Sequence, residues 1–185
     1  KIEGLERIRF MTSHPKDLSD ELIYAMRDCE KVCKHMHLPL QSGSSRILNI
    51  MNRHYDKEQY LAIVDKLRKE IPDIALTTDI IVGFPGETEE DFQEMYNFVR
   101  DGRFDRLGIF TYSHEENTHA YNSEDDVPEE VKRERADAIM ELQMGISYEL
   151  NQAKVGKTFK VLFDRIDGEY FVGRSEFDSP EVDNE

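Results

Sequence analysis

The chain has 185 residues, a formal net charge of −15 and two cysteines. It contains no run of about 18 apolar residues, so we expect no membrane-spanning segment, and its start lacks a signal-peptide pattern. Two cysteines make no disulfide framework, which indicates a reducing, cytoplasmic setting. So acidic a surface suits a basic partner better than a phosphate backbone, although solubility alone also explains acidity.

Short strands and helices alternate along the first half of the chain. Residues 7–11 predict a strand, and Ser19 caps the helix that follows. The apolar positions assigned to that helix keep helical spacing: Leu22, Ile23, Met26 and Cys33. Residues 35–40 predict the next strand, which ends at Gln41 and Ser42.

Two more helices follow. The first is short, has Arg53 just beyond it, and turns four apolar residues inward: Ile47, Leu48, Ile50 and Met51. Asp56 caps the second helix, with Gln59 at the capping-box position and Pro72 just beyond its end. The inner face of this longer helix comprises Tyr60, Ile63, Val64 and Leu67.

Residues 77–91 combine a buried strand, a Gly/Pro turn and the start of a helix. Residues 80–82 form the apolar run of a parallel strand covered on both faces, and Thr88 and Asp91 make a capping box. Asp79 interrupts this strand, and a lone buried charge is costly unless it is paired. Ligands of an α/β barrel sit at the carboxyl ends of its strands. We therefore expect Asp79 to receive ligand hydroxyls, with a carboxylate held by its neighbours as an equal alternative.

The β–α pattern continues through a further helix and strand. The helix turns Phe92, Met95, Tyr96 and Val99 inward, and the strand covers residues 107–113. Strands and helices that alternate with short connections predict an α/β fold with a parallel sheet. Four strands are too few to close an eight-stranded barrel, so we expect a piece of a larger one.

The last third of the chain changes character. Residues 115–126 are polar and turn-rich, as in a linker, and Pro128 suits the first turn of a helix that runs to about residue 153. The inner positions of that helix are Val131, Ile139, Leu142 and Ile146. Asp167-Gly168 is a hairpin signal between β-rich residues 158–166 and 169–174.

Three motifs together resemble the radical S-adenosylmethionine methylthiotransferases: SHP at residues 13–15, HLPLQSGSSRILNIMNR at 37–53, and DIIVGFPGETEEDF at 79–92. The resemblance implies that residues 1–120 form the third to sixth strands of a partial (β/α) barrel. Residues 121–156 would be a linker and connecting helix. Residues 157–185 would begin a TRAM domain, an OB-like β-barrel, here truncated to a hairpin.

The resemblance also implies a cofactor site for S-adenosylmethionine. Gln41 and Asp79 would hydrogen-bond its ribose hydroxyls, and Arg53 would pair with its carboxylate. Ile81 would pack on the adenine and the backbone of Phe110 and Thr111 would meet the adenine edge, while Ser42 and Ser13 are weaker candidates. Ordinary alternatives exist: Gln41 as a turn residue, Arg53 as a surface cation, Ile81 as core.

The family's catalytic 4Fe-4S cluster is held by a CxxxCxxC loop, which this chain does not contain. Cys29 and Cys33 imitate its first spacing, but they fall on a predicted helix with no third cysteine, so cluster ligation is not expected. A zinc site at His14, His35 and His37 is not expected either, because a matching ligand set is missing. We therefore expect no metal ligand or catalytic residue in this chain, and no activity from it alone.

The implied chemistry is insertion of a methylthio group at an unactivated C–H, with the hard step supplied by the cofactors. Residues up to 95 look closer to the tRNA-modifying branch (MiaB type), and residues from 97 onward to the branch that modifies an aspartate of a small-subunit ribosomal protein (RimO type). Residues 167–185 carry seven carboxylates against Arg174 alone. This acidity favours a basic ribosomal protein as substrate, with tRNA as the alternative.

Two readings of other classes remain open. The segment could be an acidic interaction module that grips a basic protein without catalysis. It could also belong to a different barrel enzyme that uses Asp79 and Glu87 as acid and base.

Overall fold

The computed structural model describes residues 2–10 and 14–179. The first half contains the 3-10 helix η1 and the elements α1 to β2: η1 (Pro15–Asp17), α1 (Asp20–Asp28), β1 (His35–His37), α2 (Ser45–Ile50), α3 (Lys57–Glu70) and β2 (Ala75–Val82). The second half contains α4 (Glu89–Gly102), β3 (Arg106–Thr111), the 3-10 helix η2 (His119–Asn122), α5 (Glu129–Gln152), β4 (Leu162–Asp167) and β5 (Tyr170–Arg174).

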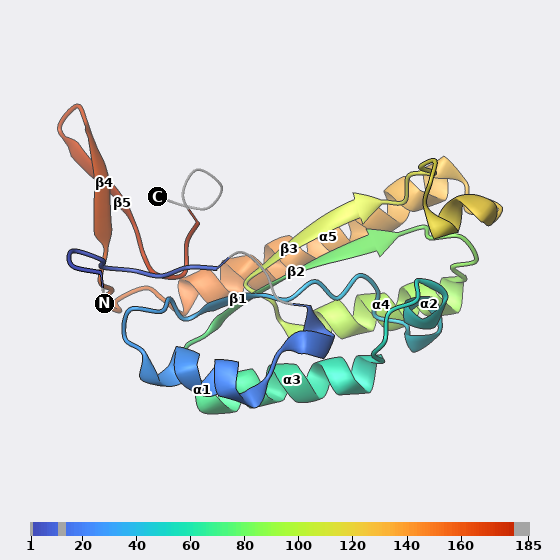
Figure 1. The fold of residues 1–185 in the computed structure, drawn as a ribbon. Coiled ribbons are helices and arrows are strands. Elements are labelled where there is room, and N and C mark those ends of the chain that lie inside the picture. Colours follow the sequence, from blue (N-terminus) through green and yellow to red (C-terminus); the bar gives the residue numbers. More distant parts are fainter. Residues whose placement is uncertain (1, 11–13, 180–185) are drawn as a thin grey trace.

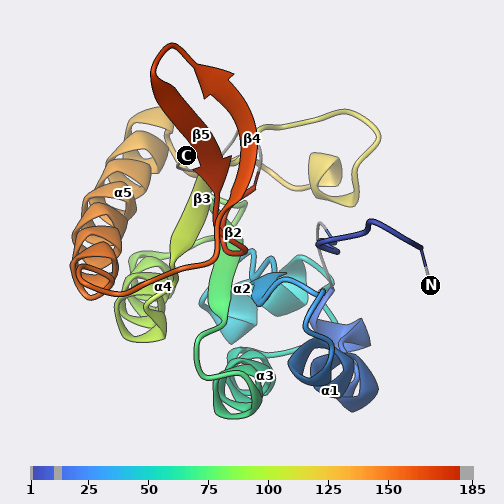
Figure 2. The same cartoon turned by 90° about the vertical axis from the view of Figure 1, so that its left-hand side faces the viewer.

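Strands β1, β2 and β3 form a parallel sheet in that order, which confirms the predicted α/β class. Figure 2 shows α1, α3, α4 and α5 as an arc around one side of this sheet. The core lies between the sheet and the helices, where Leu76, Ile80 and Val82 of β2 are buried. Packing of β–α units on one side of a parallel sheet is the geometry of a barrel segment.

The prediction of a strand over residues 7–11 is wrong for residues 7–10, which the structure describes. Ile8 makes one isolated parallel bridge to Val32, through two backbone hydrogen bonds. The neighbouring Arg7 and Arg9 instead direct their guanidinium groups to backbone carbonyls near the C-terminal hairpin. Met11, the last residue of the prediction, lies outside the described residues.

Strand β1 is shorter than the predicted 35–40. Pro39 has no backbone N–H and interrupts the ladder. Contact with β2 continues by other means, since Leu38 N donates to Thr77 O at 2.8 Å and Leu40 N to Thr78 Oγ1 at 2.9 Å. The chain therefore follows β2 up to Gln41 without forming a regular strand.

Local signals placed the helices well, with two errors. Both capping boxes are present, at Asp56 of α3 and Thr88 of α4. However, Ile50, which was predicted to point inward, is 38% exposed. Helix α1 also ends at Asp28, because Cys29 is extended, so Cys33 lies beyond the helix and is buried beside the Ile8 bridge.

Helix α5 buries charged and polar side chains that its apolar spacing did not indicate. Lys132 is fully buried and pairs with Asp125 and Glu129, each at 2.7 Å. Gln143 donates to Phe104 O at 2.8 Å. The inner face of α5 is thus fixed by polar contacts as well as by apolar packing.

Strands β4 and β5 pair antiparallel, as predicted, and Gly168 adopts a φ of 60° in the tight turn. Figure 1 shows this hairpin projecting from the molecule at the end of β2 opposite to α2. Residues 158–161 stay outside the strand, and Arg7 binds Lys160 O at 2.8 Å. None of the helices in the described ranges is long and apolar enough to cross a membrane.

Candidate functional site

The face of the sheet that points away from the helices, called the inner face below, carries polar side chains toward the carboxyl ends of the strands. Along β2, Thr78, Ile80 and Val82 are buried, whereas Asp79 and Ile81 are only partly covered. Alternation along a strand sends these two to the face opposite the helices. In the parallel register Asp79 lies beside Gly108 and Ile81 beside Phe110.

Gln41 is held directly against β2 in a strained conformation. Its backbone N donates to Asp79 O at 2.8 Å and its carbonyl accepts from Ile81 N at 2.9 Å. Its φ of 73° is left-handed, which is uncommon for a residue other than glycine. Such strain costs about 1–3 kcal/mol and persists where the surroundings over-determine it, often at ligand sites.

The Asp79 carboxylate is held by one side chain and given room by a glycine. His37 Nε2 lies 3.2 Å from Asp79 Oδ2, and His37 Nδ1 lies 2.9 Å from Thr77 Oγ1. A Cβ at Gly108 would lie 2.4 Å from Asp79 Oδ1. The Asp79 side chain remains 33% exposed.

A cavity of about 350 Å³ opens beside this carboxylate. Five of the predicted residues line it: Gln41, Asp79, Ile81, Phe110 and Thr111. Arg53 lines an adjoining cavity of about 220 Å³, and Ile81, Phe84, Thr118 and Ala120 line both. The four residues Gln41, Arg53, Asp79 and Ile81 therefore meet at one rim of the sheet.

Ser42, one of the weaker candidates, does not join this group in the described structure. Ser42 is buried, and its Oγ accepts from Ser44 N at 3.2 Å. It supports the turn after Gln41 and does not line either cavity. Ser13 lies outside the described residues.

Further residues shape the cavity without having been predicted. Tyr112 and Ser113 line its wall beyond β3, and Glu115 and Thr118 come from the segment predicted as a linker. Phe84 and Tyr112 form an edge-on ring pair at 5.2 Å. No local signal marks these positions, because they reach the cavity through the path of the chain after β3.

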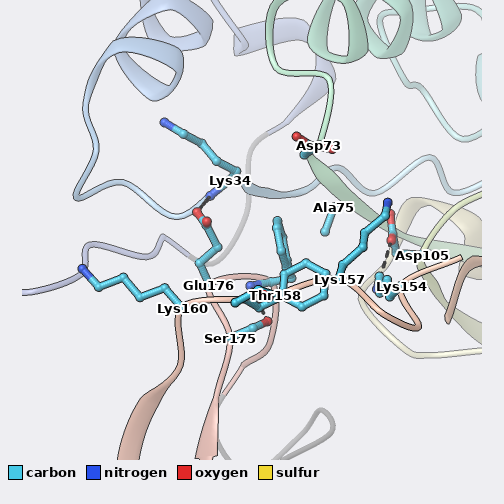
Figure 3. Close-up of a pocket in the computed structure, with 12 residues that line it drawn as sticks. Lys34, Asp73, Ala75, Asp105, Lys154, Lys157, Thr158, Lys160, Ser175 and Glu176 are labelled. Atoms are coloured by element: carbon cyan, nitrogen blue, oxygen red, sulfur yellow. Dashed lines mark hydrogen bonds and ion pairs between the residues drawn. The ribbon is translucent and has the colours of Figure 1, made fainter.

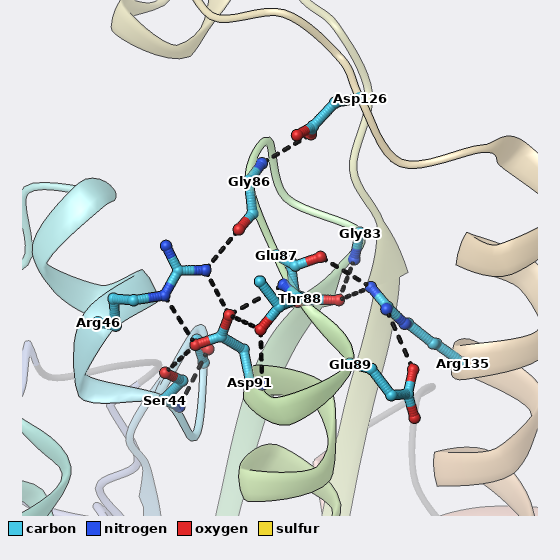
Figure 4. A network of polar contacts seen from close by, with 11 residues as sticks. Ser44, Arg46, Gly83, Gly86, Glu87, Thr88, Glu89, Asp91, Asp126 and Arg135 are labelled. Carbon is cyan, nitrogen blue, oxygen red and sulfur yellow. Dashed lines mark hydrogen bonds and ion pairs between the residues drawn. The ribbon is translucent and has the colours of Figure 1, made fainter.

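The loop after β2 is fixed by Asp91 (Figure 4). Asp91 accepts from Ser44 Oγ at 2.7 Å, Thr88 Oγ1 at 2.6 Å and Arg46 Nε at 3.1 Å. Burial alone would raise the pKa of Asp91, but the hydrogen bonds from Arg46, Thr88 and Ser44 hold this pKa well below its usual range. Asp91 thus joins α2 to the start of α4.

Glu87 is a second carboxylate of this loop, and it is 5% exposed. Its Oε1 accepts from Gly83 N at 2.9 Å and from Arg135 at 2.7 Å. Burial raises the pKa of Glu87, although Gly83 and Arg135 oppose that shift. Glu87 does not line the cavity of Asp79, so the structure gives no support to an acid–base pair formed by these two.

The described residues offer no group of three or more His, Cys, Asp and Glu side chains that could hold a metal ion. Cys29 is exposed, whereas Cys33 is buried and its burial raises the pKa of the thiol. His14 caps η1, and His35 and His37 both contact Thr77. This part of the chain therefore does not fit an iron–sulfur cluster.

A larger cavity, of about 430 Å³, lies at the opposite, amino end of the strands (Figure 3). It separates Ala75 and Asp105 from residues 157–160 and 175–177. The ammonium group of Lys34 points away from it and donates to carbonyls at the end of α1. This cavity lies between the amino end of the sheet and the C-terminal residues, remote from the predicted site residues.

Comparison with known proteins is consistent with this geometry. A model described as "Radical SAM superfamily" matches residues 1–99, and one described as "TRAM domain" matches residues 155–185. Coproporphyrinogen III oxidase (HemN) from Escherichia coli, described as a Radical SAM enzyme, is 23% identical with a TM-score of 0.56. That match covers 80% of this chain and 32% of HemN, and it shows the fold alone.

Two curated relatives are much more similar in sequence. A tRNA-2-methylthio-N(6)-dimethylallyladenosine synthase of Acetivibrio thermocellus is 57% identical over 95% of this chain and 37% of its own length. The ribosomal protein uS12 methylthiotransferase RimO of Christiangramia forsetii is 51% identical over 100% of this chain and 41% of its own length. The chain thus spans about two fifths of these relatives. The chain belongs to the Radical SAM superfamily.

Proposed function

We propose that this chain is part of a radical S-adenosylmethionine methylthiotransferase and supplies half of the cradle for S-adenosylmethionine. The observation that carries the proposal is the convergence of Gln41, Arg53, Asp79 and Ile81 at one rim of the sheet. Residues 1–120 would contribute the barrel part and residues 121–156 the linker and connecting helix. Residues 157–185 would begin the TRAM domain.

The donor set fits the cofactor's polar groups. The carboxylate of Asp79 and the amide of Gln41 suit two ribose hydroxyls, and the guanidinium of Arg53 suits a carboxylate. Ile81 offers an apolar surface to adenine. Among the described strands β3 is an edge, so Phe110 and Thr111 can present backbone groups to a base.

When bound beside a reduced 4Fe-4S cluster, S-adenosylmethionine supplies a radical that abstracts hydrogen from an unactivated carbon. This chain's residues bind and orient the nucleoside. The cluster ligands lie outside this chain on our proposal, so the 185 residues alone should be inactive. Turnover by the isolated chain would contradict that.

The binding role is tested in the full-length protein by measuring S-adenosylmethionine affinity. Asp79→Asn and Arg53→Ala should each weaken binding about tenfold or more, since each removes a charged hydrogen-bonding partner. Arg133→Ala is the matched control, because this exposed arginine lies on α5, donates to Glu129 O and lines neither cavity. Unchanged affinity in both site variants would overturn the proposal and favour an interaction module without catalysis.

For the substrate we propose an aspartate of a small-subunit ribosomal protein, modified in the cytoplasm. RimO-named relatives match the whole chain. The exposed turn of the hairpin is acidic, with Asp167 and Glu169. Part of the predicted acidic edge is not available to bind a substrate, however, because two of its carboxylates already have partners within the chain. Asp178 pairs with Arg106, and Glu176 accepts from Lys34 N at 2.9 Å.

Transfer RNA is the second candidate, favoured by the 57% identity to a tRNA methylthio-synthase. The two are separated by incubating the full-length protein with unmodified small-subunit ribosomal protein and, in parallel, with unmodified tRNA. Mass spectrometry then shows which one gains a methylthio group. Modification of the tRNA alone would overturn the ribosomal-protein assignment.

A further inference from the structure

We propose that His37 and Gly108 are positioning residues that set the orientation of the Asp79 carboxylate for ligand hydroxyls. This inference rests on the proposed S-adenosylmethionine site and names two residues that the cavity lining does not include. Both act through Asp79 from neighbouring strands. His37 ends β1 and Gly108 lies in β3, so Asp79 in β2 is flanked on both sides.

His37 holds one carboxylate oxygen within a chain of hydrogen bonds along the inner face. The order is His35 Nε2 to Thr77 Oγ1 at 3.3 Å, Thr77 Oγ1 to His37 Nδ1 at 2.9 Å, and His37 Nε2 to Asp79 Oδ2 at 3.2 Å. An ionised Asp79 only accepts, so His37 Nε2 carries the proton that it donates. A neutral His37 then accepts at Nδ1 from the Thr77 hydroxyl, which fixes its tautomer.

Gly108 provides the space for the other oxygen. Asp79 Oδ1 lies against the backbone of β3, where a Cβ at position 108 would come within 2.4 Å of it and 3.2 Å of Phe110 Cε2. Any side chain at position 108 would therefore push the carboxylate aside or displace the Phe110 ring. Glycine is required here by close approach, since its φ is not in the left-handed range.

Together these contacts restrict the Asp79 side chain without saturating it. Among the described residues, Oδ2 has His37 as its side-chain partner and Oδ1 lies beside Gly108 of β3. A third of the Asp79 side chain stays exposed, beside the cavity. Free acceptor sites in a fixed direction are what recognition of ribose hydroxyls needs, because a pre-oriented acceptor loses less freedom on binding. His37 and Gly108 supply that fixed direction.

The test is equilibrium binding of S-adenosylmethionine, and of its analogue without the 2′- and 3′-hydroxyls, to the full-length protein. His37→Phe keeps a ring but loses the donor, and should weaken S-adenosylmethionine binding about 5- to 20-fold. It should leave affinity for the dihydroxyl-free analogue unchanged, which also shows that the variant is folded. His37→Gln restores an N–H donor and should recover most of the loss. His54→Gln, at an exposed histidine, is the control.

Gly108→Ala should act in the same selective way, with Gly145→Ala as the control because nothing lies within 4 Å of a Cβ there. Asp79→Asn provides the reference. If Asp79→Asn weakens binding but His37→Phe and Gly108→Ala do not, or if they weaken both ligands equally, the positioning role is overturned. If Asp79→Asn itself has no effect, the proposed site fails, and the inference with it.

Discussion

The structure contains two regions of carboxylates: a cavity region at Asp79 of β2, and a loop region at Glu87 and Asp91, in the loop after β2 and the first turn of α4. The carboxylates of the two regions have different surroundings. In the loop region, Asp91 and Glu87 are buried and receive donors from Ser44, Arg46 and Arg135, among others. In the cavity region, Asp79 is partly exposed and His37 is its side-chain donor.

The difference separates a structural carboxylate from one available to a ligand. A buried carboxylate is costly unless it is paired. Asp91 accepts from Ser44, Arg46 and Thr88, and Glu87 is held through Oε1, while its Oε2 is buried without a hydrogen-bond partner among the described residues. Neither carboxylate lines the cavity of Asp79. Asp79 keeps acceptor capacity beside a cavity. We therefore expect substitutions in the loop region to change stability, and substitutions in the cavity region to change affinity.

The largest effect is expected from Arg135→Met. Arg135 is buried and its guanidinium contacts Glu87 and, through a cation–π contact at 5.3 Å, the Phe92 ring. Its removal leaves Glu87 buried without its cation, which costs about 3–5 kcal/mol. Urea unfolding measures the loss. Arg133→Met on the exposed face of the same helix should change little, and Glu87→Gln combined with Arg135→Met should recover part of the loss.

Asp91→Asn should cost about 2–3 kcal/mol, because donors from Arg46, Ser44 and Thr88 lose their charged acceptor. The capping box of α4 weakens at the same time. Asp101→Asn, at the exposed end of the same helix, is the matched control and should change little. Equal urea midpoints for the two variants would show that the Asp91 network is not what fixes the loop.

The pH dependence of stability should have opposite signs for Asp91 and Glu87. The folded pKa of Asp91 is lowered, so its contribution is present above its unfolded pKa of about 3.9 and is lost as pH falls further. The folded pKa of Glu87 is raised, so its contribution is present below about 4.3 and is lost as pH rises through the folded pKa.

Unfolding free energies measured from pH 3 to pH 7 would check these signs. The gap between wild type and Asp91→Asn should narrow toward the acid end. Glu87→Gln should gain stability relative to wild type as pH rises from the acid end, since its neutral amide does not ionise. A gap that stays constant with pH for either variant would contradict the assigned shift.

Local patterns were enough for much of the fold. The capping boxes at Asp56 and Thr88 and the hairpin turn at Gly168 depend on residues a few positions apart, and each was predicted. The strand at residues 7–11 failed because pairing depends on a partner that apolar spacing does not show. Apolar spacing likewise identified the inner face of α5 but not its buried Arg135.

The candidate site was likewise predicted only in part from the sequence. Strand ends and the family motifs brought Gln41, Arg53, Asp79 and Ile81 into one hypothesis, and the structure places them at one rim. The contact of His37 with Asp79 joins residues 42 apart. It depends on the register of β1 and β2, which periodicity does not determine. Gly108 carries no chemical signal at all until the strand beside it is known.

The smallest change in stability is expected from Asp79→Asn, and this variant tests the comparison most directly. The side chain is partly exposed, so loss of its charge should alter the unfolding free energy by less than about 1 kcal/mol. Affinity of the full-length protein for S-adenosylmethionine should fall in the same variant. The paired measurements are urea unfolding and equilibrium binding, with Asp91→Asn giving the reverse pattern. If Asp79→Asn destabilised the fold as much as Asp91→Asn, Asp79 would be a structural carboxylate, and the distinction between the two regions would disappear.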